Sequence, residues 1–409
     1  MGPRTTDEDK VFSTRRTLIS SPSQSYVVLK RFDTVVKNGI LVDPGTGSQS
    51  RADVGVKNGV IEEVTKEISE REASMTIDAK GKMVLPGLVD LHVHVFEGVS
   101  HYGINADQYC LKSGATTVLD AGSAGADTFH GFRKYVIDVS ETRIFAMLNI
   151  SSMGMISPVV GELEEIRFAD VQKAVRVCEK NRDVIMGIKV RLSKHLVGNN
   201  GLLPLTKAKE ASEATGRPIM VHVGDTPGPL GEILNEMRKG DVLTHCFTGL
   251  AHGILDSRGE VITEARSAVE RGVILDVGHG QGSFSFEIAR KALEQGVEPK
   301  TISSDLHTYN INGPVFDLLT TASKFIHLGL PMNHVLEKVT SIPAAFLGLQ
   351  DKVGTVRAGA FADLVLVGLE RGEFLFEDSY KNKETAKERM RPLMVMKGGK
   401  VRYDQRLSA

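Results

Sequence analysis

Eight apolar, β-branched runs recur through the middle of the chain. They lie at residues 88–93, 115–120, 143–149, 184–190, 218–223, 241–246, 272–277 and 301–305. Successive runs start 23 to 41 residues apart, which leaves room for one crossover helix in each interval. Two such helical segments are RFADVQKAVRVCEKN (167–181) and LPLTKAKEASEATG (203–216). This rhythm predicts an α/β fold with a (β/α)8 TIM barrel over residues 87–348. A doubly wound open sheet is the alternative.

Short β-strands are predicted on both sides of the barrel. In residues 31–86, the pairs Asn38-Gly39 and Asn58-Gly59 predict hairpin turns between alternating apolar positions. Residues 349–409 return to β character, interrupted by a charged segment at 379–391. We therefore expect one small composite β-sandwich domain built from both chain ends. Residues 1–30 mix charges with Ser and Thr, which is typical of a flexible extension.

Composition excludes several classes of partner. A net charge of −1 gives no electrostatic argument for binding nucleic acid or an anionic membrane surface. No apolar run approaches the roughly 20 residues of a membrane span, and residues 1–30 lack the apolar core of a signal peptide. Three cysteines, an odd number spaced far apart, fit free thiols in a reducing compartment: Cys110, Cys178 and Cys246. We expect a cytoplasmic protein without nucleic-acid or membrane partners.

Residue types that bind metals gather at the ends of the predicted strands. In a barrel, these ends meet at the rim that the βα loops build. His92 and His94 are two residues apart on one strand, so their imidazoles share a face. Later strands end in Lys189, His222, His245 and Asp305. Imidazole and carboxylate ligands suit Zn²⁺ best, with Mn²⁺, Fe²⁺, Co²⁺ or Ni²⁺ as alternatives.

Lys189 needs a separate explanation, because an ammonium among metal ligands is repelled and costly to desolvate. A buried lysine with a lowered pKa can add carbon dioxide and become a carbamate. The carbamate is anionic and has two oxygens, so it can bridge two metal ions.

The chain resembles the amidohydrolase superfamily, and within it the deacetylase-like and dihydroorotase-like binuclear metallohydrolases. The matching motifs lie within residues 31 to about 402 and are LPGLVDLHVHVF, SGATTVLDAGSAG, GIKVRLS, IMVHVGD, LTHCFTG, ISSDLH and GTVRAGAFADLVLV. The resemblance implies two divalent ions: one held by His92, His94 and Asp305, the other by His222 and His245, with carboxylated Lys189 and a hydroxide bridging both. Asp305 would then pass a proton from the attacking hydroxide to the leaving group.

Three further residues are predicted to contact the substrate. Arg191 shares the face of Lys189 but lies nearer the rim, where its planar fork of donors suits a carboxylate or carbonyl. A structural ion pair is the alternative for Arg191. His279 lies in the glycine-rich loop DVGHGQGSFSF, and His307 follows the eighth strand. Other rim residues are weaker candidates: Tyr102, Tyr309 and Asn310.

The predicted reaction is hydrolysis of an acyl bond, amide or ester, in a small molecule by a bridging hydroxide. The motifs GIKVRLS and DAGSAG favour a deacetylase of N-acyl or O-acyl small acids. Dihydroorotases of the superfamily typically carry an Arg where this chain has Phe96, which argues against that activity. Superfamily deaminases usually work without a bridging lysine, so Lys189 argues against them. A cyclic amide hydrolase is the alternative, and a non-catalytic scaffold protein would be expected to have lost ligands. By analogy with the superfamily we expect a homo-oligomer.

Overall fold

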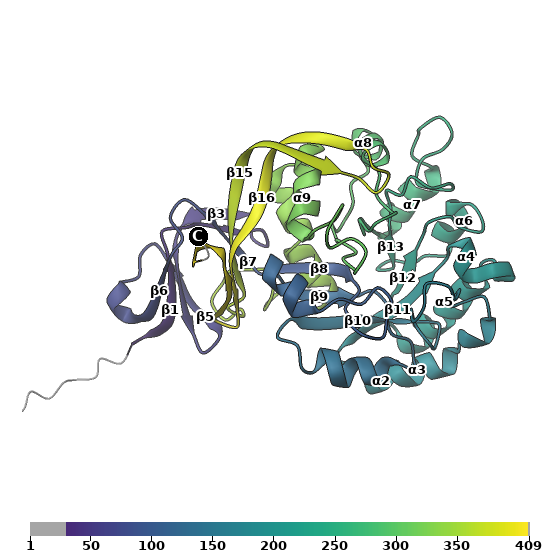
Figure 1. The fold of residues 1–409 in the computed structure, drawn as a ribbon, viewed down its shortest axis with the longest axis horizontal. Coiled ribbons are helices and arrows are strands. Elements are labelled where there is room, and N and C mark those ends of the chain that lie inside the picture. Colours follow the sequence, from purple (N-terminus) through teal and green to yellow (C-terminus); the bar gives the residue numbers. More distant parts are fainter. Residues whose placement is uncertain (1–29, 408–409) are drawn as a thin grey trace, which may run out of the picture.

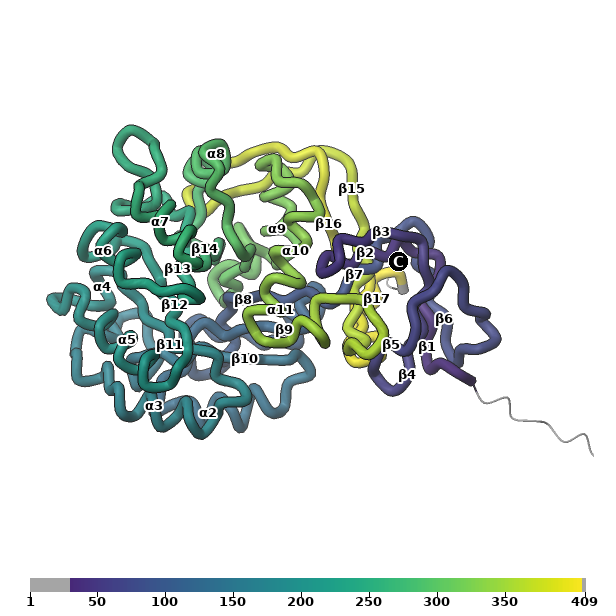
Figure 2. Tube along the Cα trace, turned by 180° about the vertical axis from the view of Figure 1, so that it is seen from behind, coloured from purple at the N-terminus to yellow at the C-terminus, as the bar shows by residue number. Residues whose placement is uncertain are grey.

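The computed structural model describes residues 30–407 and has two parts (Figure 1). One part is a curled parallel sheet surrounded by helices, and the other is a β lobe made of both chain ends (Figure 2). The predicted extension at residues 1–30 lies outside the described residues, apart from its last residue.

The parallel sheet has seven strands in sequence order. They are β8 (Leu88–Val93), β9 (Ala115–Asp120), β10 (Arg143–Asn149), β11 (Ile185–Arg191), β12 (Ile219–His222), β13 (Val242–Thr244) and β14 (Ile274–Asp276). Seven of the eight predicted strands are therefore confirmed. Their apolar side chains are buried on both faces, as expected where helices cover a parallel sheet.

The eighth predicted strand, residues 301–305, is wrong as a strand. The segment forms only isolated bridges, from Thr301 to Asp276 of β14 and from Leu306 to Val93 of β8. Asp305 has a φ of 49°, a left-handed conformation that interrupts the extended backbone between these two bridges. The observed sheet is thus a seven-stranded half-barrel, with residues 301–306 lying between its two edge strands.

Helices follow the strands as the spacing predicts. They are α1 (Ala106–Tyr109), α2 (Phe129–Phe132), α3 (Val171–Lys180), α4 (Lys194–Val197), α5 (Leu203–Thr215), α6 (Leu230–Asn235), α7 (Thr263–Arg271), α8 (Phe286–Glu294), α9 (Leu318–His327), α10 (Met332–Lys338) and α11 (Ser341–Phe346). The two helical segments identified in the sequence correspond to α3 and α5. Among the described helices, none is long and apolar enough to cross a membrane. The three cysteines are buried and free.

The β lobe contains two sheets. One has the order β5 (Val60–Thr65), β4 (Asp53–Lys57), β1 (Phe32–Lys37), β6 (Ala73–Asp78). The other has the order β17 (Lys400–Asp404), β16 (Lys383–Lys397), β15 (Leu364–Glu377), β7 (Met83–Pro86), β2 (Ile40–Asp43), β3 (Ser48–Arg51), so it mixes strands from both chain ends. Val54 and Ile77 of the first sheet share one buried cluster with Leu366 and Met394 of the second.

One of the two predicted hairpin turns is wrong. Asn58-Gly59 joins β4 to β5, which pair antiparallel with Lys57 opposite Val60. Asn38-Gly39 instead joins β1 to β2, which belong to different sheets. Asn38 has the positive φ expected of such a turn, but the amide of Ile40 bonds to Lys82 O beside β7.

The charged segment at 379–391, predicted to interrupt the C-terminal β region, forms the turn and the first part of β16 in a long hairpin. β15 and β16 pair antiparallel over nearly their whole length, and the hairpin reaches across α9 toward α8 (Figure 1). Opposite charges meet across the two strands: Glu370 with Arg389, Arg371 with Glu388, and Glu373 with Lys387. The charges therefore cover an exposed part of the hairpin.

Candidate metal centre and its cavity

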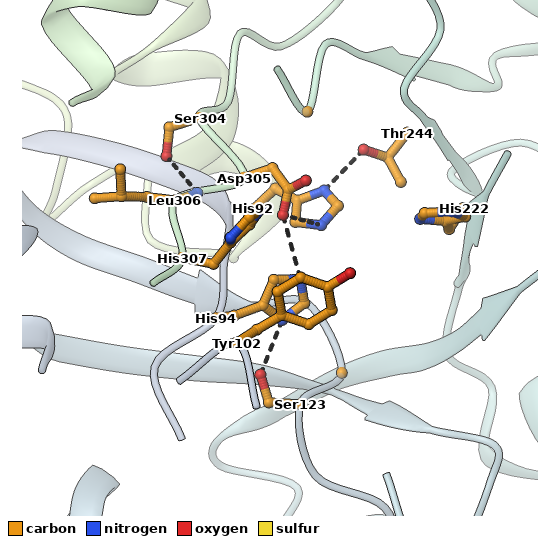
Figure 3. Close-up of polar contacts among 12 residues, drawn as sticks. His92, His94, Tyr102, Ser123, His222, Thr244, Ser304, Asp305, Leu306 and His307 are labelled. Carbon is orange, nitrogen blue, oxygen red and sulfur yellow. Dashed lines mark hydrogen bonds and ion pairs between the residues drawn. The ribbon is translucent and has the colours of Figure 1, made fainter. Parts of the chain in front are cut away.

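The six predicted ligands come together at the carboxyl-terminal edge of the half-barrel. Figure 3 labels His92, His94, His222 and Asp305 among them. They are His92 on β8 and His94 just after it, Lys189 on β11, His222 at the end of β12, His245 just after β13, and Asp305 in the segment 301–306. His222 is half-buried and the other five are buried. The fold thus brings together residues that are up to 213 positions apart, from 92 to 305, at the same edge of the half-barrel.

The side chains form two contacting groups. Asp305 Oδ1 lies 3.2 Å from His94 Nε2 and 3.4 Å from His92 Nε2 (Figure 3). His222 Nδ1 lies 2.9 Å from His245 Nε2. Lys189 Nζ is 3.5 Å from His92 Nε2. Ligand atoms of His92, His245 and Asp305 all lie within 4.8 Å of one another.

A hydrogen-bond chain fixes the tautomer of His92. Asp276 accepts hydrogen bonds from the hydroxyls of Thr244, Thr301 and Ser303, at 2.8, 2.6 and 2.7 Å. The single hydroxyl proton of Thr244 is therefore used, so Thr244 Oγ1 accepts from His92 Nδ1, 2.8 Å away. His92 Nε2 then carries a lone pair. His245 is fixed in the same way, because its Nδ1 lies 2.7 Å from the carbonyl oxygen of Gly278, which can only accept.

The resulting arrangement fits a cation. Asp305 Oδ1 is a buried acceptor that no hydrogen-bond donor within residues 30–407 satisfies, although two imidazole nitrogens approach it. At least one of these nitrogens, His92 Nε2, offers a lone pair and not a proton. Buried acceptors that face one another without a donor are costly unless something positive lies among them. Imidazole nitrogens and a carboxylate are the ligands that divalent zinc and related metals take.

Burial keeps these groups in the protonation states that metal binding requires. Burial lowers the pKa of His92, His94 and His222 well below the usual range, and it lowers that of His245 to about 4. The imidazoles are therefore neutral at pH 7. Burial also lowers the pKa of Lys189 to about 7, so much of its amine is uncharged and nucleophilic near neutral pH.

A cavity of about 340 Å³ opens onto the cluster. Five of the six predicted ligands line it, all except His92, together with Arg191 and His307. Its other walls come from the rim loops and include Tyr102, Met155, His195, Leu250, Gln281, Gly282 and Tyr309. The cavity is large enough for a small organic acid.

Comparison with known proteins settles the family. The sequence model of the amidohydrolase family matches residues 83–402. The chain belongs to this family. It is 37% identical over 378 residues to a protein from Enterococcus faecalis named deacetylase, covering 91% of this chain and 99% of that protein. Two solved structures are similar. One, titled an adenine deaminase, has 36% sequence identity and a TM-score of 0.84, and the match covers 90% of this chain and 99% of that one. The other, titled a dihydroorotase, has 33% identity and a TM-score of 0.83, and the match covers 90% of this chain and 98% of that one. Because these two structures are named for different reactions, the amidohydrolase fold alone does not specify the substrate.

Arg191 and His307, two of the three predicted substrate-binding residues, lie on the cavity wall. Arg191 is buried and its Nη1 lies 3.2 Å from Glu162 Oε1, so the alternative of an ion pair is realised. Its guanidinium also lies over the ring of Tyr102, and its Nε is a buried donor without a partner in the described part of the chain. His307 packs its ring 4.6 Å from that of Tyr102.

His279 has a different environment. Its Nε2 accepts a hydrogen bond of 2.7 Å from Lys324 Nζ, its Nδ1 lies 2.9 Å from Gly280 O, and its ring packs 4.5 Å from that of Phe284. Among the described residues, His279 is not one of those that line the cavity. Phe96 is also absent from the lining, because it is buried and packs its ring 4.7 Å from Phe132.

Three buried carboxylates that support the site were missed in the sequence: Asp90, Asp120 and Asp276. Asp90 accepts from Ser304 and from the amide of His92, and burial raises its pKa to about 7. Asp120 accepts from the amides of Val95 and Ser123. Asp120 and Asp276 end β9 and β14, so considering every polar residue at a strand end would have found both.

Two site residues have a strained backbone. His245 has a φ of 68° and Asp305 a φ of 49°, in the left-handed region that non-glycine residues rarely adopt. Neighbouring glycines make room for them: a Cβ on Gly278 would collide with Thr244 and His245, and one on Gly280 would collide with Asp305. The missing side chains of Gly278 and Gly280 therefore leave the space that the candidate ligands His245 and Asp305 occupy.

Proposed function

We propose that this amidohydrolase is a metal-dependent hydrolase that cleaves an acyl bond, amide or ester, in a small molecule. Its proposed substrates are N-acyl or O-acyl small acids, from which it removes the acyl group. The observation that carries the proposal is the unsatisfied Asp305 Oδ1, which faces imidazole nitrogens beside the buried amine of Lys189. The 37% identity to a protein named deacetylase supports this choice of reaction.

The proposed centre holds two divalent ions, Zn²⁺ first and Mn²⁺, Fe²⁺, Co²⁺ or Ni²⁺ as alternatives. His92, His94 and Asp305 would hold one ion and His222 and His245 the other, with Lys189, carboxylated by carbon dioxide or bicarbonate, between them. Such ions lower the pKa of water and polarise a carbonyl. The lowered pKa of Lys189 supports carboxylation, because only the neutral amine adds carbon dioxide.

The chain's own residues supply the remaining functions. Asp305 lies against both the cavity and the imidazoles, so its carboxylate can take a proton from water and give it to the leaving group. Arg191 lines the cavity, and its guanidinium is proposed to donate to a substrate carboxylate, with Glu162 and Tyr102 holding the guanidinium in place. His307 packs on the same aromatic wall and is proposed to contact the substrate.

A cyclic amide hydrolase, dihydroorotase-like or hydantoinase-like, is the second candidate, favoured by the 33% identity to a structure titled a dihydroorotase. Phe96 argues against the dihydroorotase form, because its ring is packed against Phe132 and offers the cavity no cation. The cytoplasmic location and the homo-oligomeric state stay predictions.

The test is a substrate panel. Purified protein supplied with Zn²⁺ or Mn²⁺ and bicarbonate is assayed on N-acetyl amino acids, O-acetyl hydroxy acids, and cyclic amides and imides. We expect acetate release from the first two groups. Ring opening without acetate release would select the second candidate. No turnover of any compound by a protein that binds metal would refute the hydrolase proposal over this range of substrates.

A further inference from the structure

The β15–β16 hairpin extends from the β lobe to the rim of the cavity. Its tip, residues 377–382, consists of the last residue of β15 and the turn that leads to β16. Figure 1 shows the hairpin passing over α9 and ending near α8. The sequence provided no reason to connect this segment with the site, which lies in the other part of the molecule.

The hairpin tip binds the loop that follows β14. Ser379 Oγ lies 3.0 Å from Gly280 O and 3.2 Å from His279 O. The amide of Ser379 also donates to Phe284 O at 3.0 Å. This loop carries Gly280, whose missing side chain makes room for the Asp305 carboxylate. The tip therefore contacts Gly280, which in turn packs against the candidate metal ligand Asp305.

Tyr380 connects two loops with one hydroxyl. Its oxygen accepts a hydrogen bond of 2.8 Å from the amide of Gly249 and donates one of 3.0 Å to Gly282 O. The Thr248 hydroxyl lies 3.2 Å from the same oxygen. A Cβ on Gly249 would lie 2.8 Å from Tyr380 Cε2, so the glycine leaves room for the ring.

The two loops follow adjacent strands of the half-barrel, and both contribute to the edge of the cavity, here called the cavity lip and formed by Leu250, Gln281 and Gly282. Gly249 follows β13 and precedes Leu250, whereas Gly282 follows β14 and lies beside Gln281. Leu250, Gln281 and Gly282 all line the cavity. The Tyr380 hydroxyl thus adds a link between these two wall segments, beyond the point where the pairing of β13 with β14 ends.

Several hydrogen bonds hold the hairpin tip, and with it Tyr380, in place. The buried carboxylate of Asp378 accepts from the amides of Tyr380 and Asn382, at 2.8 and 2.9 Å, and from that of Phe286 at 3.2 Å. Lys324 of α9 donates 2.8 Å to Glu377 O and 2.7 Å to His279 Nε2. The tip is therefore held to both α8 and α9 before Tyr380 reaches the lip.

We propose that Tyr380 is a positioning residue for substrate binding: its hydroxyl holds the loops at 248–250 and 278–283 together and so sets the width of the cavity lip. The effect on substrate rests on the proposed function, whereas the effect on the loops does not.

The test compares Tyr380→Phe with a matched hairpin variant. Tyr380→Phe keeps the ring against Gly249 and removes only the hydroxyl. Glu384→Gln weakens hairpin contacts elsewhere, namely the ion pairs of Glu384 with Arg290 and His327. Both variants are measured by amide hydrogen exchange, bound metal and, on the best substrate of the panel, KM and kcat.

For Tyr380→Phe we expect exchange about fivefold faster in the loops at 248–250 and 278–283, as befits the loss of a hydrogen bond. We also expect KM to rise several-fold, with bound metal and kcat close to wild type. Glu384→Gln should leave both loops and KM unchanged. Unchanged exchange in both loops, or equal effects of the two variants, would overturn the proposal. A wild type inactive on the whole panel would refute the proposed function, and the exchange result would still decide whether Tyr380 positions the loops.

Discussion

Replacing Thr244 by valine should weaken metal binding, although Thr244 is not itself a proposed ligand. The threonine accepts from His92 Nδ1 at 2.8 Å and donates to Asp276 at 2.8 Å. Valine has nearly the same shape but can do neither. His92 Nδ1 would then be a buried donor without a partner, and nothing would hold the proton on that nitrogen and keep Nε2 free for a metal.

The expected loss follows from comparable ligand-orienting contacts. Removing the group that orients a metal-bound histidine typically costs about 10–100-fold in metal affinity, or about 1.4–2.7 kcal/mol. Thr301→Val is the matched control. Thr301 is equally buried and donates to the same Asp276 at 2.6 Å, but its hydroxyl has no contact with His92. Each variant loses one hydrogen bond to a carboxylate, which should lower the free energy of unfolding of the metal-free protein by about 2 kcal/mol. Thr244→Val should lose about 1–3 kcal/mol more, because it also leaves His92 Nδ1 buried without a partner.

The assay is competition for Zn²⁺ between the metal-free protein and a chromophoric chelator, in bicarbonate buffer. Thr244→Val should raise the dissociation constant about 10–100-fold, and Thr301→Val by less than about threefold. The reasoning is refuted if Thr244→Val binds zinc as tightly as wild type, or if the two variants weaken binding equally.

Three further predictions concern the active site and its surroundings. Asp305→Asn should keep most of the bound metal but abolish turnover, and activity near that of wild type would remove its proton-shuttle role. Arg191→Gln should raise KM for an acidic substrate about 10–100-fold, as expected for a lost charge-assisted hydrogen bond, whereas a neutral amide analogue should be affected much less. An equal loss for both substrates would contradict carboxylate recognition. Burial lowers the pKa of Lys324 to about 7 from its usual 10.5, so the unfolded chain binds more protons between these values and stability rises with pH. The free energy of unfolding should therefore rise by about 2 kcal/mol more in wild type than in Lys324→Met between pH 7 and pH 9. Parallel pH profiles from denaturant titrations would show that Lys324 is charged in the folded state.

The sequence predicted those features that follow from a local pattern. Seven apolar runs became strands, and residues at their ends came together, because parallel strands present their carboxyl ends at one edge. The eighth run failed for a reason that no local pattern contains. Ser303 and Ser304 direct their hydroxyls to the buried Asp276 and Asp90, and Asp305 adopts a positive φ. The contact with Asp90 depends on a strand more than 200 residues earlier, and the contact with Asp276 depends on the neighbouring strand β14.

The two Asn-Gly turns and the charged segment at 379–391 also depend on contacts that a local sequence pattern does not contain. Asn38-Gly39 and Asn58-Gly59 have the same turn signal, and both asparagines have a positive φ. Only the second forms a hairpin, because the partner of a strand is decided by which sheet buries its apolar face. The charged segment at 379–391 is expected to interrupt the β region, but its charges in β16 pair with opposite charges on β15. The role proposed for Tyr380 likewise depends on a hairpin that reaches from one part of the molecule to the other.

The central claim, a two-metal centre bridged through Lys189, is tested most directly by metal content. Wild type and Lys189→Ala are purified in parallel, supplied with Zn²⁺ and bicarbonate, freed of loosely bound ions and measured by inductively coupled plasma mass spectrometry. We predict about two ions per chain in wild type and no more than about one in Lys189→Ala, because the variant lacks the bridging ligand. Well under one tightly bound ion per chain in wild type, or equal metal content in the two proteins, would contradict it.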